Sequence, residues 1–306
     1  MSLAPLREHL PRMTDRLALG KGGLQVSPFC LGLTASPDAV SAAYDHGVNF
    51  FFFSADMHWP LYESTRRGLE KLLQRGGGIR DRIVVGVVSY CTQPEFCIAP
   101  FQEALTAVPG LERIDLAIAG GAYSHELLMR LPILHQHRTS RFLGIRAIGC
   151  TFHDRAGARL MTGRDLLDIV YIRYNTLHPG ARVDLFGHVT EKRSDLLFNF
   201  KNTIGFIPPS RYARLGLGED HWQPKFTDHY RFILSRPELD GILCAMGTPD
   251  HVEQLARALE EGPLDEEEEQ YLLDLALLDQ GKAELGPGGS PSGGPAGHPG
   301  GAPLVD

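Results

Sequence analysis

Residues 82–88 read RIVVGVV, a short run of apolar residues in which apolar and polar positions do not alternate. Such a run is typical of a strand that is buried on both faces, as in a parallel sheet. Similar runs recur along the chain, and each is followed by a loop and then by a stretch with helical spacing. They are PFCLGLT (28–34), VNFFFFS (48–54), IDLAIAG (114–120), FLGIRAIGC (142–150), DIVYIRYN (168–175), TIGFIP (203–208) and DGILCAMG (240–247).

The stretches between these runs carry apolar residues at helical spacing, which predicts helices. They cover residues 38–46, 61–74, 98–107, 124–137, 154–161, 182–198, 225–235 and 249–260. Strands that alternate in this way with helices predict the α/β class, and eight such units predict a (β/α)8 TIM barrel.

The C-terminal part of the sequence has a different composition. Pro263–Gln280 has the apolar stripe of a final helix, whereas residues 281–306 consist mainly of Gly and Pro and offer almost nothing to bury. We therefore expect one barrel over residues 1–280 and a disordered tail over residues 281–306.

The composition excludes several classes of protein. The chain has 306 residues, of which 43% are apolar and 22% charged, and a net charge of −7, so it is neither disordered nor collagenous. It has no basic cluster for a nucleic acid or an anionic membrane, no apolar stretch that could span a bilayer and no apolar segment for secretion. These features predict a cytoplasmic protein with a small-molecule partner, and they leave the oligomeric state open.

The five cysteines are odd in number and widely spread. Most of them lie within apolar runs, which favours reduced, buried thiols over a disulfide framework. They are Cys30, Cys91, Cys97, Cys150 and Cys244.

A (β/α)8 barrel carries its ligands and its chemistry at the C-terminal ends of its strands. The side chains that follow the predicted strands are therefore the candidates for a site. They are Thr34, Ser54, Asp56, His58, Ser89, Tyr90, Cys91, Gly121, Tyr123, Thr151, His153, Asn175, His178, Pro208 to Ser210, Gly247 and Thr248.

Over about residues 17–275, the order of these segments resembles the aldo-keto reductases. The segments that carry the resemblance are LGKGGLQVSPFCLGLT, GVNFFFFSADMH, RDRIVVGVV, IDLAIAG, FLGIRAIGCTF, IVYIRYNTLH and DGILCAMGTPDHVEQ. The resemblance implies a barrel that reduces carbonyls with NADPH, using a Tyr proton donor, a Lys and an Asp that tune it, and a His beside the carbonyl oxygen.

The chain departs from this pattern at the matching positions. The family's D-T-A-x-x-Y segment falls on residues 53–58, which puts Phe53 at the Asp and His58 at the Tyr. Without a one-residue insertion in the Phe run, the pair is Phe52 and Met57. The third-strand Lys falls on Val88 and the fourth-strand His on Gly120. Apolar residues cannot tune a tyrosine, so this alignment argues against ordinary carbonyl reduction.

The cofactor pocket implied by the resemblance also differs. The family's Ser-Asn pair falls on Thr151-Phe152, its sixth-strand Gln on Tyr171, and its stacking Tyr on Ile207. Gly247 and Thr248 begin a helix whose N-terminus could hold an anion, without the basic residue that usually grips the adenosine phosphate. Binding of NADP(H) at Thr151, Gly247 and Thr248 therefore stays an open alternative.

His58 is the one position of the family's four that can still move a proton, because a histidine exchanges its proton near neutral pH. Asp56, two residues before it, is the second candidate catalytic residue. Trp59 and Tyr62 would wall an apolar pocket, and Tyr90, Tyr123 and Asn175 are further candidates for contact with a substrate. In an alternative interpretation, His58, His153 and His178 converge on a mononuclear metal ion.

Arg146 and Arg173 fall inside strand runs, where an unpaired charge would be costly. One interpretation pairs them with Asp56, Asp115 or Asp168. In the other, Arg173 holds a substrate carboxylate in bidentate fashion.

Three hypotheses remain. The first is a divergent enzyme of the aldo-keto reductase fold that acts on a small apolar or aromatic metabolite, with His58 as acid or base. The second is an NADP(H)-dependent oxidoreductase with a rebuilt site. The third is a catalytically inactive barrel that serves as a binding or regulatory subunit.

Overall fold

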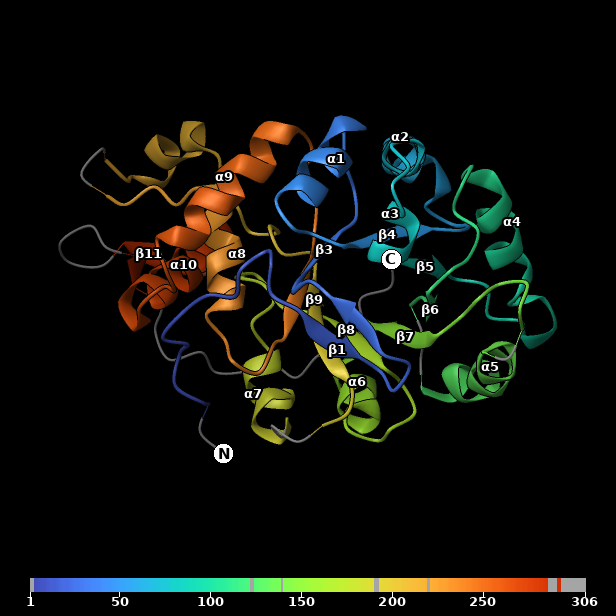
Figure 1. Ribbon diagram of the computed structural model, residues 1–306. Coiled ribbons are helices and arrows are strands. Elements are labelled where there is room, and N and C mark those ends of the chain that lie inside the picture. Colours follow the sequence, from blue (N-terminus) through green and yellow to red (C-terminus); the bar gives the residue numbers. More distant parts are fainter. Residues whose placement is uncertain are drawn as a thin grey trace.

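A computed structural model describes residues 3–121, 124–138, 140–189, 193–218, 221–285 and 291–292. Eight parallel strands close into a barrel, in which β10 pairs with both β9 and β3 (Figure 1). The predicted (β/α)8 barrel is confirmed. The barrel strands are β3 (Phe29–Leu31), β4 (Phe50–Ser54), β5 (Val84–Ser89), β6 (Leu116–Ala119), β7 (Ala147–Phe152), β8 (Ile169–Arg173), β9 (Leu196–Phe200) and β10 (Gly241–Cys244).

Helices surround the barrel, and most of them begin and end close to the predicted bounds (Figure 1). The α-helices are α1 (Asp38–Asp45), α2 (Glu63–Gln74), α3 (Ile79–Arg82), α4 (Ala99–Ala107), α5 (Ser124–His137), α6 (Arg155–Met161), α7 (Ala181–Asp184), α8 (Phe226–Leu234), α9 (Pro249–Glu260) and α10 (Glu266–Asp279). The 3-10 helices are η1 (Trp59–Tyr62), η2 (Pro94–Phe96), η3 (Phe186–His188) and η4 (Pro209–Leu215).

The seventh barrel strand lies earlier in the chain than predicted. The predicted strand at 203–208 and the predicted helix at 182–198 are both wrong. β9 occupies Leu196–Phe200, and the short helices α7 and η3 are the elements in the described part of 181–195. All five residues of β9 are buried, and they pair with β8 on one side and β10 on the other. In the run 203–208, Gly205 has a φ of 103°, and this run does not continue the sheet.

Aspartates fix the N-terminal ends of three strands. Asp115, Asp168 and Asp240 each directly precede a strand, namely β6, β8 and β10. Each carboxylate accepts a hydrogen bond from the second N–H of the preceding strand, at 2.9, 2.7 and 2.7 Å. Each also pairs with arginine, with Arg80 and Arg113 on Asp115, Arg138 on Asp168 and Arg193 on Asp240. This end of a barrel serves stability.

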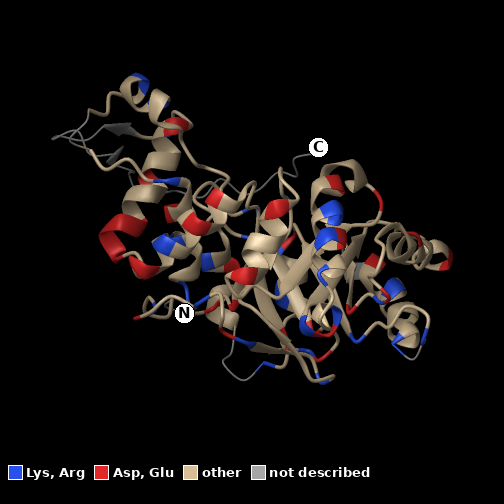
Figure 2. Ribbon diagram, turned by 45° about the horizontal axis from the view of Figure 1, so that its top comes forward, with Lys and Arg blue, Asp and Glu red and all other residues tan. Residues whose placement is uncertain are grey.

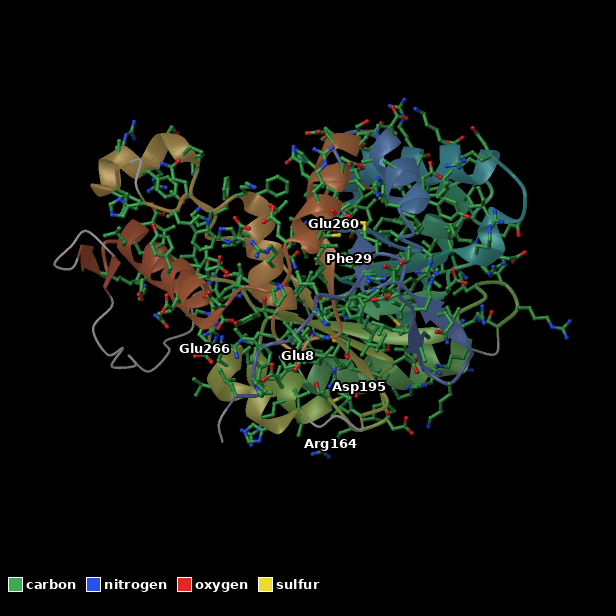
Figure 3. All side chains as sticks on the ribbon, turned by 60° about the vertical axis from the view of Figure 1, so that its left-hand side comes forward. Glu8, Phe29, Arg164, Asp195, Glu260 and Glu266 are labelled. Atoms are coloured by element: carbon green, nitrogen blue, oxygen red, sulfur yellow. The ribbon has the colours of Figure 1, made fainter. Side chains whose placement is uncertain are left out.

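Asp195 precedes β9 in the same way, although its carboxylate accepts the N–H of Gly163. It lies at the same edge of the molecule as Arg164, away from Phe29 on β3 (Figure 3). A hairpin of β1 (Leu17–Leu19) and β2 (Leu24–Val26) is tied to the start of β4, because Asn49 accepts the N–H of Ser27 and donates to the carbonyl of Gln25. The hairpin therefore lies at the end of the barrel opposite the candidate site.

The remaining predictions concern the ends of the chain, its charge and its thiols. Asp265 caps α10, whose first turn is acidic (Figure 2). Beyond it, β11 (Glu284–Leu285) pairs with β12 (Pro291–Ser292), and most of the predicted tail lies outside the described residues. None of the five cysteines, all of which lie in the described ranges, forms a disulfide, and only Cys91 is not buried. Within the described ranges, no helix is both long and apolar enough to cross a membrane.

Candidate functional site at the barrel mouth

Strand register defines which side chains point into the barrel. Rings from strands that do not pair meet across the interior, with centroids 5.8 Å apart for Phe50 and Phe198 and 6.0 Å apart for Phe52 and Tyr171. Paired residues of parallel strands face the same side, so alternate residues along each strand share this direction. The inward positions nearest the C-terminal ends of the strands are Ser54, Val88, Thr151, Arg173 and Phe200.

Asp56 ties the loop after β4 to the end of β5. Its carboxylate accepts hydrogen bonds from the hydroxyl of Ser89 at 2.7 Å, from the N–H of Tyr90 at 2.8 Å and from the N–H of Met57 at 2.7 Å. A carboxylate with three donors from its own chain holds its neighbours in place. Asp56 therefore positions the loop after β4 against the end of β5 at the mouth of the barrel.

The loop that Asp56 holds brings two predicted site residues together. The ring of His58 meets that of Tyr90 edge-on, with centroids 5.1 Å apart, and both side chains are half-buried. The ring of Tyr90 also covers Gly120, where an added Cβ would lie 2.8 Å from the ring. Burial, and next the charge of Asp56, raise the pKa of Tyr90. Its phenol is therefore neutral near pH 7 and can donate a hydrogen bond.

Two further hydroxyls lie on this side of the mouth. The ring of Tyr62 packs on Phe52 at 5.9 Å, and burial raises its pKa, with smaller contributions from Tyr90 and Cys30. The hydroxyl of Ser54 is buried and has no hydrogen-bond partner in the described part of the chain. A buried hydroxyl without a partner is costly, so a ligand group or a water that accepted its proton would be favoured.

A buried arginine bonds the backbone of β5 on this side of the mouth. Arg130 on α5 is fully buried and donates from Nη2 to the carbonyl of Ser89 at 2.8 Å. Its Nε and Nη1 have no partner among the described residues, and burial lowers its pKa. Ser89 therefore bonds Asp56 through its side chain and Arg130 through its backbone.

The opposite side of the mouth is formed by the ends of β7, β8 and β9. Asn175 donates from Nδ2 to the carbonyl of Lys201 at 2.9 Å, and its Oδ1 accepts the N–H of His178. The ring of His153 meets Phe200 edge-on at 5.2 Å. Desolvation, and then the charges of Lys201 and Arg173, lower the pKa of His153 to about 4. The amide of Asn175 is thus already engaged with Lys201 and His178, and Asn175 positions these two residues.

Arg173 does not form an ion pair with Asp56, Asp115 or Asp168, contrary to the first interpretation of the arginines in strand runs. Asp115 and Asp168 bind other arginines, and Asp56 accepts donors from Met57 and from the end of β5. Arg146 instead donates to the carbonyl of Gly22 at 2.9 Å. Pairing of Arg146 or Arg173 with these aspartates is therefore wrong.

Other predicted site residues lie elsewhere. Trp59 packs on the outward-facing Phe53, and the guanidinium of Arg66 lies 3.5 Å from its ring centroid, so the structure does not bring Trp59 into the mouth. Tyr123 lies outside the described residues. His58, His153 and His178 do not form a ligand set, since no group of three His, Cys, Asp or Glu suited to a metal occurs in the part of the chain that the structure describes.

The predicted cofactor residues are engaged within the protein. The hydroxyl of Thr151 accepts the N–H of Gly121 at 2.8 Å. The carbonyl of Gly247 accepts the N–H groups of Ala35 and Ser36, and the hydroxyl of Thr248 caps α9. The first turn of α9 carries Asp250, has neither Lys nor Arg, and holds His251, whose Nδ1 accepts the N–H of Gly247. Gly247 and Thr248 thus have clear structural roles in starting α9.

Comparison with known proteins relates the fold of this chain to solved structures. No protein-family model matches the chain, and no curated protein does either. Solved structures do match. The aldo-keto reductase AKR11C1 from Bacillus halodurans, in its holo form, is 13% identical, with a TM-score of 0.67 over 86% of this chain and 96% of that one.

Two further solved structures give the same result. The putative aldo-keto reductase PA4992 from Pseudomona aeruginosa is 17% identical, with a TM-score of 0.60 over 82% of this chain and 97% of that one. The thermostable aldo-keto reductase Tm1743, in complex with the inhibitor epalrestat, is 15% identical, with a TM-score of 0.61 over 85% and 99%. The chain therefore has the fold of the aldo-keto reductases.

Proposed function

We propose that the chain is a divergent cytoplasmic enzyme of the aldo-keto reductase family that transfers a proton to or from a small molecule at the barrel mouth. The contact between His58 and Tyr90 carries this proposal. In it, His58 takes up or releases the proton, and the neutral phenol of Tyr90 donates a hydrogen bond to a substrate oxygen. Asp56 keeps the two rings together by holding the backbone of Tyr90.

The side chains at the matching positions support chemistry other than the family's carbonyl reduction. Both candidate positions for the family Asp hold phenylalanine: Phe52 packs on Tyr62 and Tyr171 inside the barrel, and Phe53 packs on Trp59 outside it. Val88 faces inward, and the ring of Tyr90 covers Gly120. None of these groups can carry a charge that would tune a phenol donor.

The residues at the expected cofactor positions do not fit NADP(H). A 2′-phosphate needs a cation or free N–H groups, whereas the start of α9 carries Asp250 and a cap that already uses Thr248. The hydroxyl of Thr151, expected near the nicotinamide amide, is bonded to Gly121. We therefore assign no step to a nicotinamide cofactor.

A metabolite-profiling experiment tests the proposal. The purified protein is incubated with a mixture of small metabolites, with and without NADPH, and changes are followed by mass spectrometry. We expect at least one conversion that proceeds without NADPH and leaves added NADPH intact. A conversion that consumes NADPH would instead support the oxidoreductase alternative. If no metabolite changed while some bound, the barrel would be a binding subunit.

A further inference from the structure

Arg173 differs from most of the arginines with limited exposure, because it bonds no carboxylate in the described ranges. Arg80, Arg193, Arg231 and Arg236 are buried or nearly so, and each bonds a carboxylate. Arg173 is half-buried at the inward-facing end of β8, and its guanidinium has no hydrogen bond or ion pair to any described residue. An arginine offers several donors in a fixed fork that matches a planar oxyanion. These donors are free for a ligand.

The charges that shift the pKa of Arg173 and of its neighbours are positive. Desolvation and then Arg155 lower the pKa of Arg173, and desolvation and then Arg173 lower the pKa of Lys201. The same cations lower the pKa values of His153 and His178, after desolvation. Like charges held together destabilise one another, and a bound anion would relieve this repulsion.

The nearby carboxylates are already engaged. Asp184 accepts from Nε of Arg155 at 2.6 Å, and Asp154 accepts the N–H groups of Ala156 and Gly157 as the cap of α6. Neither carboxylate bonds Arg173 or Lys201. The positive charge of these two residues is therefore not balanced by a direct ion pair within the described chain.

The cluster is held by the fold. Arg173 pairs in register with Phe200, whose neighbour Lys201 is fixed through its carbonyl by Asn175. His153 packs on the ring of Phe200. A cavity between α6 and α7 is lined by His153 and Arg155, and neither Arg173 nor Lys201 lines it. The cluster itself is placed by the strand register and by the ring contact.

We propose that Arg173, Lys201 and His153 form an anion site that binds a carboxylate or phosphate group of the substrate. The assignment of the anion to a substrate rests on the proposed function. Arg173 supplies the bidentate donor, Lys201 a second positive charge, and His153 a neutral ring that can donate a hydrogen bond. Because Arg173 and Tyr171 lie on one strand, and Tyr171 meets Phe52 of β4 below the mouth, the anion would sit across the mouth from His58 and Tyr90.

Binding of simple anions tests this site without a need for turnover. Inorganic phosphate, benzoate and the neutral analogue benzyl alcohol are titrated into the wild-type protein by calorimetry. We expect phosphate or benzoate to bind and benzyl alcohol to bind more weakly than benzoate. The anion that binds more tightly identifies the group, phosphate or carboxylate. If neither anion bound the wild-type protein, the proposal would be overturned.

Substitutions test whether the anions bind at Arg173 and Lys201. We expect Arg173→Met to weaken anion binding by about tenfold or more, since charge-assisted hydrogen bonds are lost. Lys201→Met should weaken anion binding as well. Because Lys201 is exposed, this variant should fold normally, so it still tests the site if Arg173→Met does not fold. Arg146→Met, an exposed arginine bonded to Gly22, is the matched control and should bind like the wild type. Equal binding by wild type, Arg173→Met and Lys201→Met would contradict the proposal.

Two further arms separate this inference from the proposed function. His58→Gln should bind the anions as the wild type does, so a failure of His58 as proton carrier leaves the anion site standing. NADPH is titrated in parallel. If it bound in an Arg173-dependent manner while phosphate and benzoate did not bind, the site would serve a nucleotide and the assignment to a substrate would be wrong.

Discussion

Tyr90 lies over Gly120 so closely that a Cβ at residue 120 would be 2.8 Å from the Tyr90 ring and 2.8 Å from Cγ2 of Val88. Gly120 directly follows β6, and its N–H donates to the carbonyl of Ser89 in β5. The absence of a side chain at Gly120 therefore allows Tyr90 to turn toward His58. This packing shapes the side of the mouth that His58 and Tyr90 form.

We expect Gly120→Ala to push the Tyr90 ring out of place. Overpacking of this kind destabilises a protein by about 1–3 kcal/mol, measured by denaturant unfolding, and activity at the mouth should fall with it. The control is Gly22→Ala, where the added Cβ would meet Arg146 at an ordinary 3.5 Å. If both variants unfolded alike, Gly120 would not hold Tyr90 as described.

A second prediction concerns the stability that the aspartates at the N-terminal ends of the strands contribute. Asp115→Ala leaves Arg80 buried with its charge unpaired and the N–H of Val85 without its acceptor. Loss of one partner of a buried pair costs about 3–5 kcal/mol. The comparison is Asp45→Ala, which removes an exposed pair with Arg75 and should cost far less, because solvent screens such a pair. Similar unfolding free energies for the two variants would contradict this role of Asp115.

His229 makes folding depend on pH. It is buried, its Nδ1 has no partner among the described residues, and desolvation lowers its pKa from 6.5 to about 4. Below pH 6.5 the unfolded chain therefore binds a proton that the folded chain resists, so the stability contributed by the neutral ring is lost as the pH falls. Between pH 7 and pH 5 the loss is about 2 kcal/mol.

The measurement is the free energy of unfolding at pH 7 and at pH 5, for the wild type and for His229→Phe. The wild type should lose more stability than the variant, by roughly 2 kcal/mol. An equal loss in both proteins would show that His229 does not contribute. Because the effect comes from one buried ring, added salt should change it little.

Most of the fold could be predicted from the sequence, because seven barrel strands are near-continuous apolar runs. The run LLFNF was missed because its neighbours carry apolar residues at helical spacing and because TIGFIP resembles a strand in composition. Asp195 gives a signal that could have found it. The patterns ID-LAIA, LD-IVYI and LD-GILC place an aspartate directly before a strand, and SD-LLFNF repeats that pattern.

Less of the site could be predicted. Position after a strand found His58 and Tyr90, since the barrel brings strand ends together, and a charge inside a strand run found Arg173. It did not find Lys201, because the seventh strand was misplaced. It could not show that Asp56 holds Tyr90 or that Trp59 turns outward, because both depend on side-chain packing between residues that are not regularly spaced.

The most direct test of the central claim is the turnover of His58→Gln on a metabolite that the wild type converts, alongside Tyr90→Phe. General acid–base groups typically contribute about 100- to 10,000-fold. We therefore expect His58→Gln to lower kcat by at least about 100-fold, with unfolding free energy and anion binding close to those of the wild type, and Tyr90→Phe to be impaired less. Wild-type turnover in a folded His58→Gln protein would contradict the assignment of His58 as the proton carrier.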